Sequence, residues 1–450
     1  MNPELLRNLW LEATPFRLAQ IVGLLVLVLA VASAAPQSIL TPEGATTTLY
    51  WFFVVLWGTR NAALSVVGEI RERTWDGQKL SAIGPWTMMW GKLLGATSAN
   101  WFGGLLCLPV ILFAAWRDAG PVTALSYGVI LLALGLFSQA VALLSSLVLI
   151  RRNTGNWRLD TFLCQVAGIG AGFAYYSLWS SVDAFEQSGM RSLTWWGHAF
   201  NLTSFHFTSL LIFLGWALLG VWRAMRAELR FANGPFVWLA YLAYTAIYTA
   251  GFESLLANFG VSLMAPMGHV TPRLMLAVLA LGASAYSMVF LEPKDLVRLR
   301  WLADQFRAGR YAKAFLALDA WMLSYAATIL CGLALAGLMT MDRSSLGSVS
   351  FAGLSLPVLA MLGFLTRDVA IFVLMRVLAG SKGDFAALAC LGALYLVLPA
   401  IAHRSGLGFA FLVLPVIGSA AVWSALLAWT QAAIAIWLAM RAMTSAFKAS

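Results

Sequence analysis

Charged residues are scarce in this chain, and no segment of it is both long and polar. Only 11% of the 450 residues are charged, whereas 61% are hydrophobic and the mean hydropathy is +0.82. Typical soluble domains carry roughly 25% charged residues. The composition therefore excludes a separate soluble domain and predicts a polytopic membrane protein.

Cysteine and histidine are also rare, which limits disulfide and metal chemistry. The four histidines are scattered over separate loops without His-x-His or i, i+4 spacing. The four cysteines fall within apolar segments at no metal-like spacing, so we interpret them as small core residues: Cys107, Cys164, Cys331 and Cys390. We expect neither a metal site nor a disulfide framework.

Two phosphate-binding motifs are missing. The Gly-Lys pair at Gly91-Lys92 is followed by Leu93, so the chain has no P-loop. It also has no Asp-Asp-x-x-Asp motif that would hold Mg²⁺ and a polyprenyl diphosphate. The first absence excludes ATP hydrolysis by a P-loop in this chain, and the second argues against a membrane transferase.

Apolar windows of about 20 residues, enough to cross a hydrocarbon core of about 30 Å, recur along the whole chain. They are continuous rather than alternating, which indicates helices and not barrel strands. We predict an all-α polytopic fold with about twelve transmembrane helices. The predicted spans are 17–36, 49–68, 93–116, 121–150, 161–180, 203–223, 235–256, 272–291, 314–337, 351–378, 384–402 and 419–440.

The distribution of basic residues predicts the orientation. With both termini cytoplasmic, most of the 29 Lys and Arg residues lie on the cytoplasmic side, as membrane insertion favours. Five would lie outside: Arg117, Arg191, Arg273, Arg343 and Arg404. The net charge of +10 then reflects topology and contact with anionic headgroups, so we expect membrane lipid as a partner and no nucleic acid.

The chain shows signs of a diverged duplication. Five of seven positions match between 221–227 and 436–442, at an offset of 215 residues. Weaker matches occur in the same order at similar offsets. We predict two six-helix halves, 1–230 and 231–450, which an even number of spans places in parallel orientation. Parallel repeats of this kind place a pathway at their interface in transporters.

One compact polar segment, 69–92, separates the second and third predicted spans. Its charged residues have both signs, and its apolar residues include Trp75, Leu80, Ile83 and Trp86. In a contact with another protein, the charges would set the register and the aromatic side chains would supply binding energy.

This segment resembles the coupling segment of type-2 ATP-binding-cassette (ABC) exporter permeases. The N-terminal stretch that starts Asn2-Pro3-Glu4-Leu5 is similar to that family's interfacial elbow helix. The coupling-segment residues that match, in order, are Gly68-Glu69, Glu72-Arg73-Thr74-Trp75-Asp76, Leu80-Ser81, Pro85 and Gly91-Lys92-Leu93-Leu94-Gly95. The resemblance implies the ABC type-2 transporter fold.

The resemblance also implies a function. The chain would be the membrane-spanning permease subunit of an ATP-driven exporter in the bacterial cytoplasmic (inner) membrane, and not itself an enzyme. We expect no cofactor in this chain. ATP and Mg²⁺ would bind to a separate ABC-type ATPase subunit, two copies of which would work against the two halves.

The residues expected to couple to that partner lie in two loops. The second loop, 292–310, keeps the mixed charge of the first but lacks its Thr-Trp-Asp and Gly-Lys-Leu sequences, so we expect the halves to be asymmetric. The expected coupling residues are Glu69, Glu72, Arg73, Thr74, Trp75, Asp76, Leu80, Pro85 and Trp86 in the first loop, and Glu292, Asp295, Arg298 and Trp301 in the second.

Segments 194–202 and 407–418, each before the last span of its half, are too apolar for free loops. The resembling family places short re-entrant helices here. An outer gate built on them would include Trp195, Trp196, Phe409 and Pro415. The alternative is a belt of Trp side chains that anchors both segments to the outer headgroups.

Five ionisable residues lie within or near predicted spans, where such groups usually face a protein interior or water: Arg60, Glu253, Asp319, Arg367 and Asp368. The neighbours Arg367 and Asp368 can neutralise each other. We favour a structural ion pair for each of the five residues. For Arg60, contact with an anionic lipid-like substrate is the alternative.

Two other functions compete with the exporter interpretation. A membrane enzyme acting on lipid or polyprenyl substrates would need ionisable groups that converge at one depth. A secondary transporter would need interrupted helices with paired acidic residues at the midplane, for which Glu253 and Asp368 are the candidates. The sequence does not specify the substrate.

Overall fold

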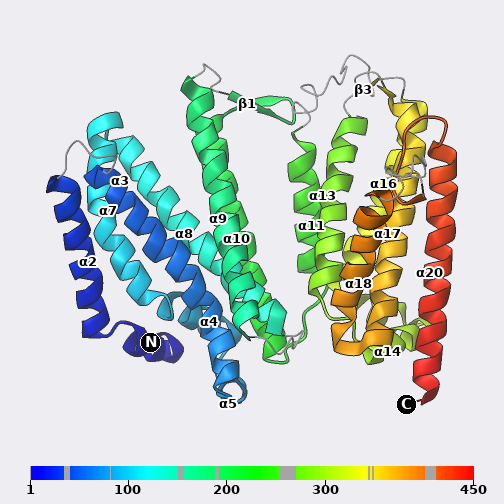
Figure 1. Cartoon of the computed structure of the whole chain (residues 1–450), viewed down its shortest axis with the longest axis horizontal. Helices are drawn as coiled ribbons and strands as arrows, with labels where there is room; N and C mark the ends of the chain where they lie inside the picture. The colour runs from blue at the N-terminus through cyan, green and yellow to red at the C-terminus, as the bar shows by residue number, and fades with distance from the viewer. Residues whose placement is uncertain are drawn as a thin grey trace. The chain divides into compact units, whose positions relative to one another are not determined.

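The computed structural model describes residues 2–34, 41–81, 83–150, 157–187, 192–252, 270–342, 345–346, 349–400 and 412–449. Two of the predicted site residues, Glu253 and Phe409, lie outside these ranges. Most of the described residues are helical, and the others include two short two-stranded sheets (Figure 1). The sheets are formed by β1 (Ser192–Trp195) with β2 (His198–Asn201), and by β3 (Ser345–Leu346) with β4 (Val349–Ser350).

Within the described ranges, nine helices are long and apolar enough to cross a membrane, which confirms the predicted multi-pass, helical character. They are α2 (Pro15–Ala34), α7 (Ser98–Ala119), α8 (Pro121–Ile150), α10 (Leu202–Glu228), α13 (Val270–Leu291), α16 (Ala320–Met341), α17 (Phe351–Ala379), the run of α18 (Gly383–Gly392) and η4 (Ala393–Val397), and α20 (Ala421–Ala449).

The other three predicted spans are also helical, but they are not among these nine candidate helices. Span 49–68 lies in a continuous helical run made of α3 (Pro42–Tyr50), the π-helical η1 (Trp51–Trp57) and α4 (Gly58–Arg71). Span 161–180 lies within α9 (Trp157–Gln187). Span 235–256 contains α11 (Phe236–Ala250), whose 15 residues are fewer than the roughly 20 that a perpendicular crossing needs. The count of twelve spans therefore stays a prediction.

The chain divides into two compact units. The first comprises Met1–Leu193 with Phe200–Asn233, and the second comprises Thr194–Ala199 with Gly234–Ser450. Small residues let the helices approach closely in both, as is typical of membrane bundles. In the first unit, a Cβ atom added to Gly135 would lie 2.4 Å from Val54; in the second, one added to Gly363 would lie 2.8 Å from the Cβ of Ala428.

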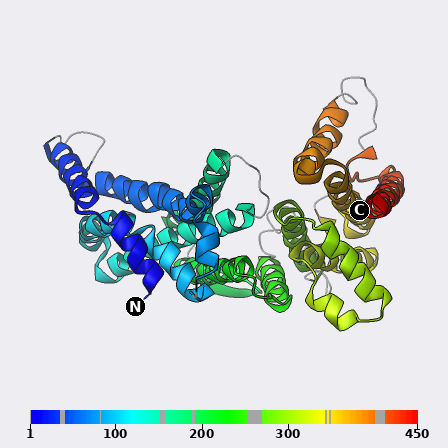
Figure 2. The same ribbon diagram turned by 90° about the horizontal axis from the view of Figure 1, so that it is seen from below.

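Short helices lie at one end of each unit. In the first unit these are α1 (Pro3–Glu12), α5 (Trp75–Lys79) and α6 (Pro85–Trp90), which continues into the π-helical η2 (Gly91–Gly95). Helix α1 lies across the ends of the longer helices, and α5 is at the tip of the unit (Figures 1 and 2). In the second unit, α14 (Leu296–Arg307) and α15 (Tyr311–Leu316) connect α13 to α16.

Candidate functional site

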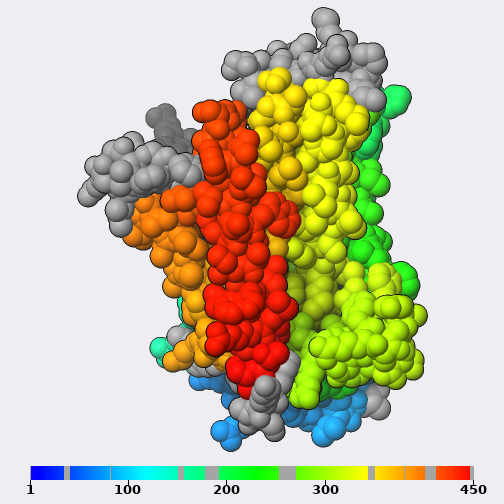
Figure 3. All heavy atoms as spheres, turned by 90° about the vertical axis from the view of Figure 1, so that its right-hand side faces the viewer, coloured from blue at the N-terminus to red at the C-terminus, as the bar shows by residue number. Residues whose placement is uncertain are grey.

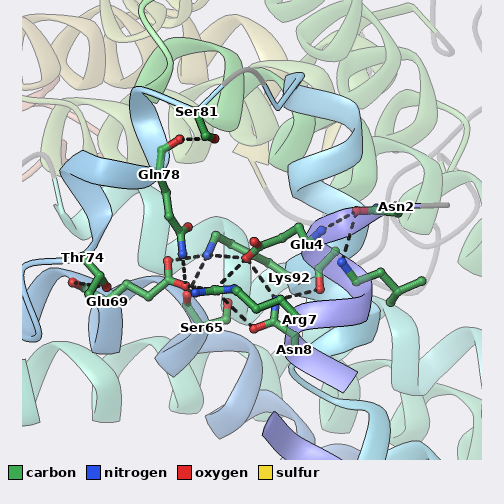
Figure 4. Close-up of polar contacts among 12 residues, drawn as sticks. Asn2, Glu4, Arg7, Asn8, Ser65, Glu69, Thr74, Gln78, Ser81 and Lys92 are labelled. Carbon is green, nitrogen blue, oxygen red and sulfur yellow. Dashed lines mark hydrogen bonds and ion pairs between the residues drawn. The ribbon is translucent and has the colours of Figure 1, made fainter. Parts of the chain in front are cut away.

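A buried lysine forms the centre of the candidate site in the first unit. The side chain of Lys92, in η2, is fully buried at the start of the third predicted span. Its ammonium group forms ion pairs with Glu4, at 3.2 Å, and with Glu69, and it donates a hydrogen bond to the carbonyl oxygen of Ser65 at 3.1 Å (Figure 4). One side chain thus connects α1, α4 and η2.

The two carboxylates around Lys92 have further donors. Glu69 also accepts hydrogen bonds from Arg7 and from Nε2 of Gln78, the latter at 2.6 Å. Glu4 accepts from Arg7 at 2.9 Å and from Asn8 at 3.0 Å. Two acidic and two basic side chains therefore form a cluster of zero net charge, which is the arrangement that a buried ionic site requires.

Residues at the start of α1 hold this helix against the α6–η2 segment. Asn2 caps it by accepting from the backbone N–H groups of Glu4 and Leu5, and its amide donates to the carbonyl oxygen of Thr87 at 2.7 Å. Close backbone approach is possible because residue 91 is glycine: an added Cβ atom would lie 2.6 Å from the Cβ of Glu4. The elbow-like N-terminal stretch is therefore a helix packed on the polar loop.

The environment of Arg7 favours its charged form. Burial by itself lowers the pKa of Arg7, but the hydrogen bond to Glu69 and the charges of Glu4 and Glu69 outweigh it, and the net shift is upward. The guanidinium group therefore remains protonated and keeps both carboxylates paired from the solvent side.

Trp75 is not the exposed anchor that the sequence suggested. Only 3% of this residue is exposed, and its ring lies 5.0 Å from Nζ of Lys92 and 5.6 Å from Nζ of Lys79. Arg73 adopts a φ of 58°, a left-handed conformation that ends α4 and turns the chain into α5. This turn directs the first residue of α5 inward, where it packs against Met88 and Met89.

Several other residues of the first loop lie on the surface around Trp75. Glu72, Arg73 and Thr74 are exposed, as is the Asp76 side chain, and Leu80 is 88% exposed. Lys79 lies 3.6 Å from Asp76 and 3.5 Å from Glu228 of α10. Pro85 occupies the first turn of α6, where a proline is well tolerated, and the next residue, Trp86, is 58% exposed.

The second loop has a different arrangement. Glu292 accepts a hydrogen bond from the backbone N–H of Trp321 at 2.9 Å, and Asp295 caps α14 by accepting from the N–H of Val297. Arg298 pairs with Asp319 at 2.9 Å, which confirms an ion pair for Asp319. Trp301 is 43% exposed.

Asp319 lies outside the helix in which the sequence placed it. Span 314–337 was expected to include it, but α16 begins at Ala320, directly after Asp319. Burial raises the pKa of Asp319 and the charge of Arg298 opposes that shift.

Lys294 is a buried charge that the sequence interpretation missed. It pairs with Asp384, at the start of α18, at 2.7 Å, and its Nζ lies 4.9 Å from the Phe372 ring centroid. Lys294 lies three residues after Leu291, the last residue of α13. A basic residue so close to the end of an apolar helix was the sequence feature that could have pointed to it. The residue that neutralises it is 90 positions away, so local sequence could not identify the pair.

Arg367 and Asp368 form the predicted ion pair in the middle of α17. Nη2 of Arg367 lies 2.8 Å from Oδ1 of Asp368, and the two residues are 3% and 0% exposed. Oδ2 of Asp368 accepts hydrogen bonds from Tyr286 at 2.8 Å and Tyr395 at 2.7 Å. Nη1 of Arg367 donates to Gln431 at 2.7 Å, so the pair connects α17 with α13, η4 and α20.

Arg60 is exposed on α4, and within the described ranges no ion pair involves it. The structural ion pair that we favoured for Arg60 is thus not present in the part of the chain that the structure describes.

The predicted outer-gate residues do not lie on re-entrant helices where the structure describes them. Trp195 ends β1 and Trp196 is in the turn that follows, so a small sheet occupies this position. The indole N–H groups of Trp195 and Trp196 donate to the carbonyl oxygens of Tyr248 and Ile247, at 3.0 and 3.2 Å. Pro415 is exposed on a non-helical segment before α20.

Among the described residues, no group of three or more His, Cys, Asp or Glu side chains is arranged to hold a metal ion. Comparisons of the chain with protein-family models, with curated proteins and with solved structures gave no match.

Proposed function

We propose that this chain is the membrane-spanning permease subunit of an ATP-driven exporter of the ABC type-2 class, and that its first polar loop docks on a separate ATPase subunit. The observation that carries the proposal is the combination, in this loop, of an exposed tip and a buried ionic base. Helix α5 and the start of α6 present exposed charged and apolar side chains, while the base of the loop is held by the buried Lys92 cluster.

The cluster suits the transmission of a mechanical displacement. A partner that pushes α5 moves Glu69 at the end of α4, and the ion pairs of Lys92 pass this displacement to α1 and η2. Helix α4 continues without interruption into η1 and α3, so the motion would enter the apolar region along one helical run. Domain closures in proteins use such rigid elements joined at a few hinge positions.

The partner supplies the nucleotide chemistry in this proposal. The chain has no P-loop, so ATP and Mg²⁺ are assigned to the ATPase subunit, and this chain contributes the path and the docking surface. The direction of transport rests on the resemblance of the 69–92 segment to exporter permeases.

The test is co-purification of the tagged chain with its ATPase in mild detergent. We expect the double variant Asp76→Ala/Leu80→Ala to lose the ATPase, because both residues are exposed and docking removes them from water. The matched control is Trp10→Ala, which removes an apolar side chain of similar exposure, 81%, on α1. Loss of the ATPase in the control as well, or full retention in the double variant, would contradict the proposal.

The Arg367–Asp368 pair favours one competing function, a secondary transporter. A buried carboxylate in mid-helix is a common element of ion-coupled transport, and here it is shared with two tyrosines from neighbouring helices. This alternative requires transport into proteoliposomes that contain only this chain, driven by a pH gradient and abolished by Asp368→Asn. The exporter proposal requires no transport under those conditions.

A further inference from the structure

We infer that the α14–α15 segment is an interfacial binding surface for anionic phospholipid headgroups, rather than a second docking site for an ATPase. This segment leaves several apolar side chains uncovered. Six are exposed, with fractions between 39% and 75%: Val297, Trp301, Phe306, Tyr311, Phe315 and Leu316. Only Leu302, Gln305 and Ala314 of the two helices are buried.

The charge of this segment indicates that its partner is anionic. Residues 296–316 contain five basic side chains and one acidic side chain, Asp304. Arg298 pairs with the buried Asp319, and Arg307 lies 3.6 Å from Asp304 at the surface. Arg307, Arg310 and Lys313 are all exposed. Basic side chains interleaved with Trp, Tyr and Phe are typical of helices that lie in the headgroup layer of an anionic leaflet.

The position of α14–α15 within the second unit is consistent with contact to lipid headgroups. Figure 3 shows α14–α15 (yellow-green) on the flank of the bundle, level with the lower half of α20 (red) and not beyond its end. Helix α20 is one of the candidate membrane spans. A headgroup layer surrounds the flank of a spanning bundle near its end, so the exposed face of α14–α15 would meet lipid there.

The test uses the full chain in lipid nanodiscs without any ATPase, so its outcome is independent of the proposed exporter function. Hydrogen–deuterium exchange of the amides in 296–316 is compared between nanodiscs of phosphatidylglycerol with phosphatidylcholine and nanodiscs of phosphatidylcholine alone. We expect slower exchange with phosphatidylglycerol, and a smaller difference in 0.5 M NaCl because salt screens the headgroup charge.

Paired variants test the basic side chains. The double variant Arg307→Gln/Lys313→Gln removes two exposed charges from the surface. We expect the loss of each charge to weaken the lipid-dependent protection about fivefold at low salt. The control, Arg158→Gln/Arg441→Gln, removes two exposed charges on other helices and should keep the protection. As a second readout, brominated phosphatidylglycerol should quench a fluorescence component that is absent in Trp301→Phe.

Two results would overturn the inference. One is equal exchange of 296–316 in both kinds of nanodisc in the unmodified chain. The other is protection of this segment that appears only after the ATPase is added, which would assign the surface to a protein partner instead.

Discussion

A lysine that is removed from water needs anionic partners, because the cost of an unpaired buried charge amounts to several kcal/mol. Lys92 meets this requirement through Glu4 and Glu69, which come from two other helices. At the scale of single residues, the removal of one partner from such a contact therefore leaves an uncompensated charge within an apolar bundle.

The first prediction concerns this cluster. Lys92→Met should lower the free energy of unfolding by about 3 kcal/mol, because Glu4 and Glu69 lose a buried cation while Arg7 remains to pair with both. Unfolding by SDS in mixed micelles measures the change. Arg17→Met is the control: its ion pair with Glu12 is more exposed and should be worth less than about 1 kcal/mol. Equal losses in the two variants would contradict the assigned role of Lys92.

The second prediction concerns α17. Asp368→Asn preserves the shape of the side chain but leaves Arg367 without its counter-charge, so we expect a loss of about 3–5 kcal/mol in the same unfolding assay. Adding Arg367→Met to this variant should recover much of the loss, because both buried charges are then absent. A double variant as unstable as the sum of the single variants would show that the residues act independently.

At the scale of elements, the packing of α1 on η2 depends on the absence of a side chain at Gly91. We predict that Gly91→Ala destabilises the protein by about 1–3 kcal/mol, since the new methyl group would overlap Glu4 and the backbone N of Leu5. The hydrogen-exchange rates of the α1 backbone amides should increase in the Gly91→Ala variant. Gly77→Ala is the matched control in α5: its Cβ atom meets nothing within 4 Å, and alanine should stabilise this helix slightly. Similar effects of both substitutions would show that α1 is not held by this contact.

The residues in and around α5 show how well local sequence predicts which side chains of an element are exposed. The mixed charges of 69–92 predicted a segment that offers charged and apolar side chains to a soluble surface, and Leu80 and Trp86 are exposed, whereas Met88, Met89 and Lys92 are buried. The same composition suggested that Trp75 was exposed too. Its burial depends on the left-handed turn at Arg73 and on a cluster of apolar side chains from α6 and other helices, which local composition does not encode.

At the scale of the whole molecule, the number of membrane crossings determines whether the termini share a side. The nine candidate helices of the described ranges would, if they alone crossed, place the termini on opposite sides, whereas twelve crossings place both on the same side. The bias of Lys and Arg residues predicts that both termini are cytoplasmic, an arrangement that twelve crossings would satisfy.

Reporter fusions test this prediction. Green fluorescent protein fluoresces when it is fused on the cytoplasmic side, so we expect fluorescence from fusions at either terminus. Alkaline phosphatase should be active when fused after Arg117, in a predicted outer loop. Fluorescence at only one terminus would instead mean that an odd number of helices cross.

The sequence by itself determined the helical, multi-pass character of the protein, because apolar runs of sufficient length can satisfy their backbone hydrogen bonds in lipid only as helices. It also identified Arg367 and Asp368 as a pair, since they are neighbours in the chain. Only the tertiary structure decided that Lys92 binds Glu4, 88 residues away, and that Lys294 binds Asp384. Such partners are selected by helix packing, which brings distant side chains together at specific depths, and no local pattern records that choice.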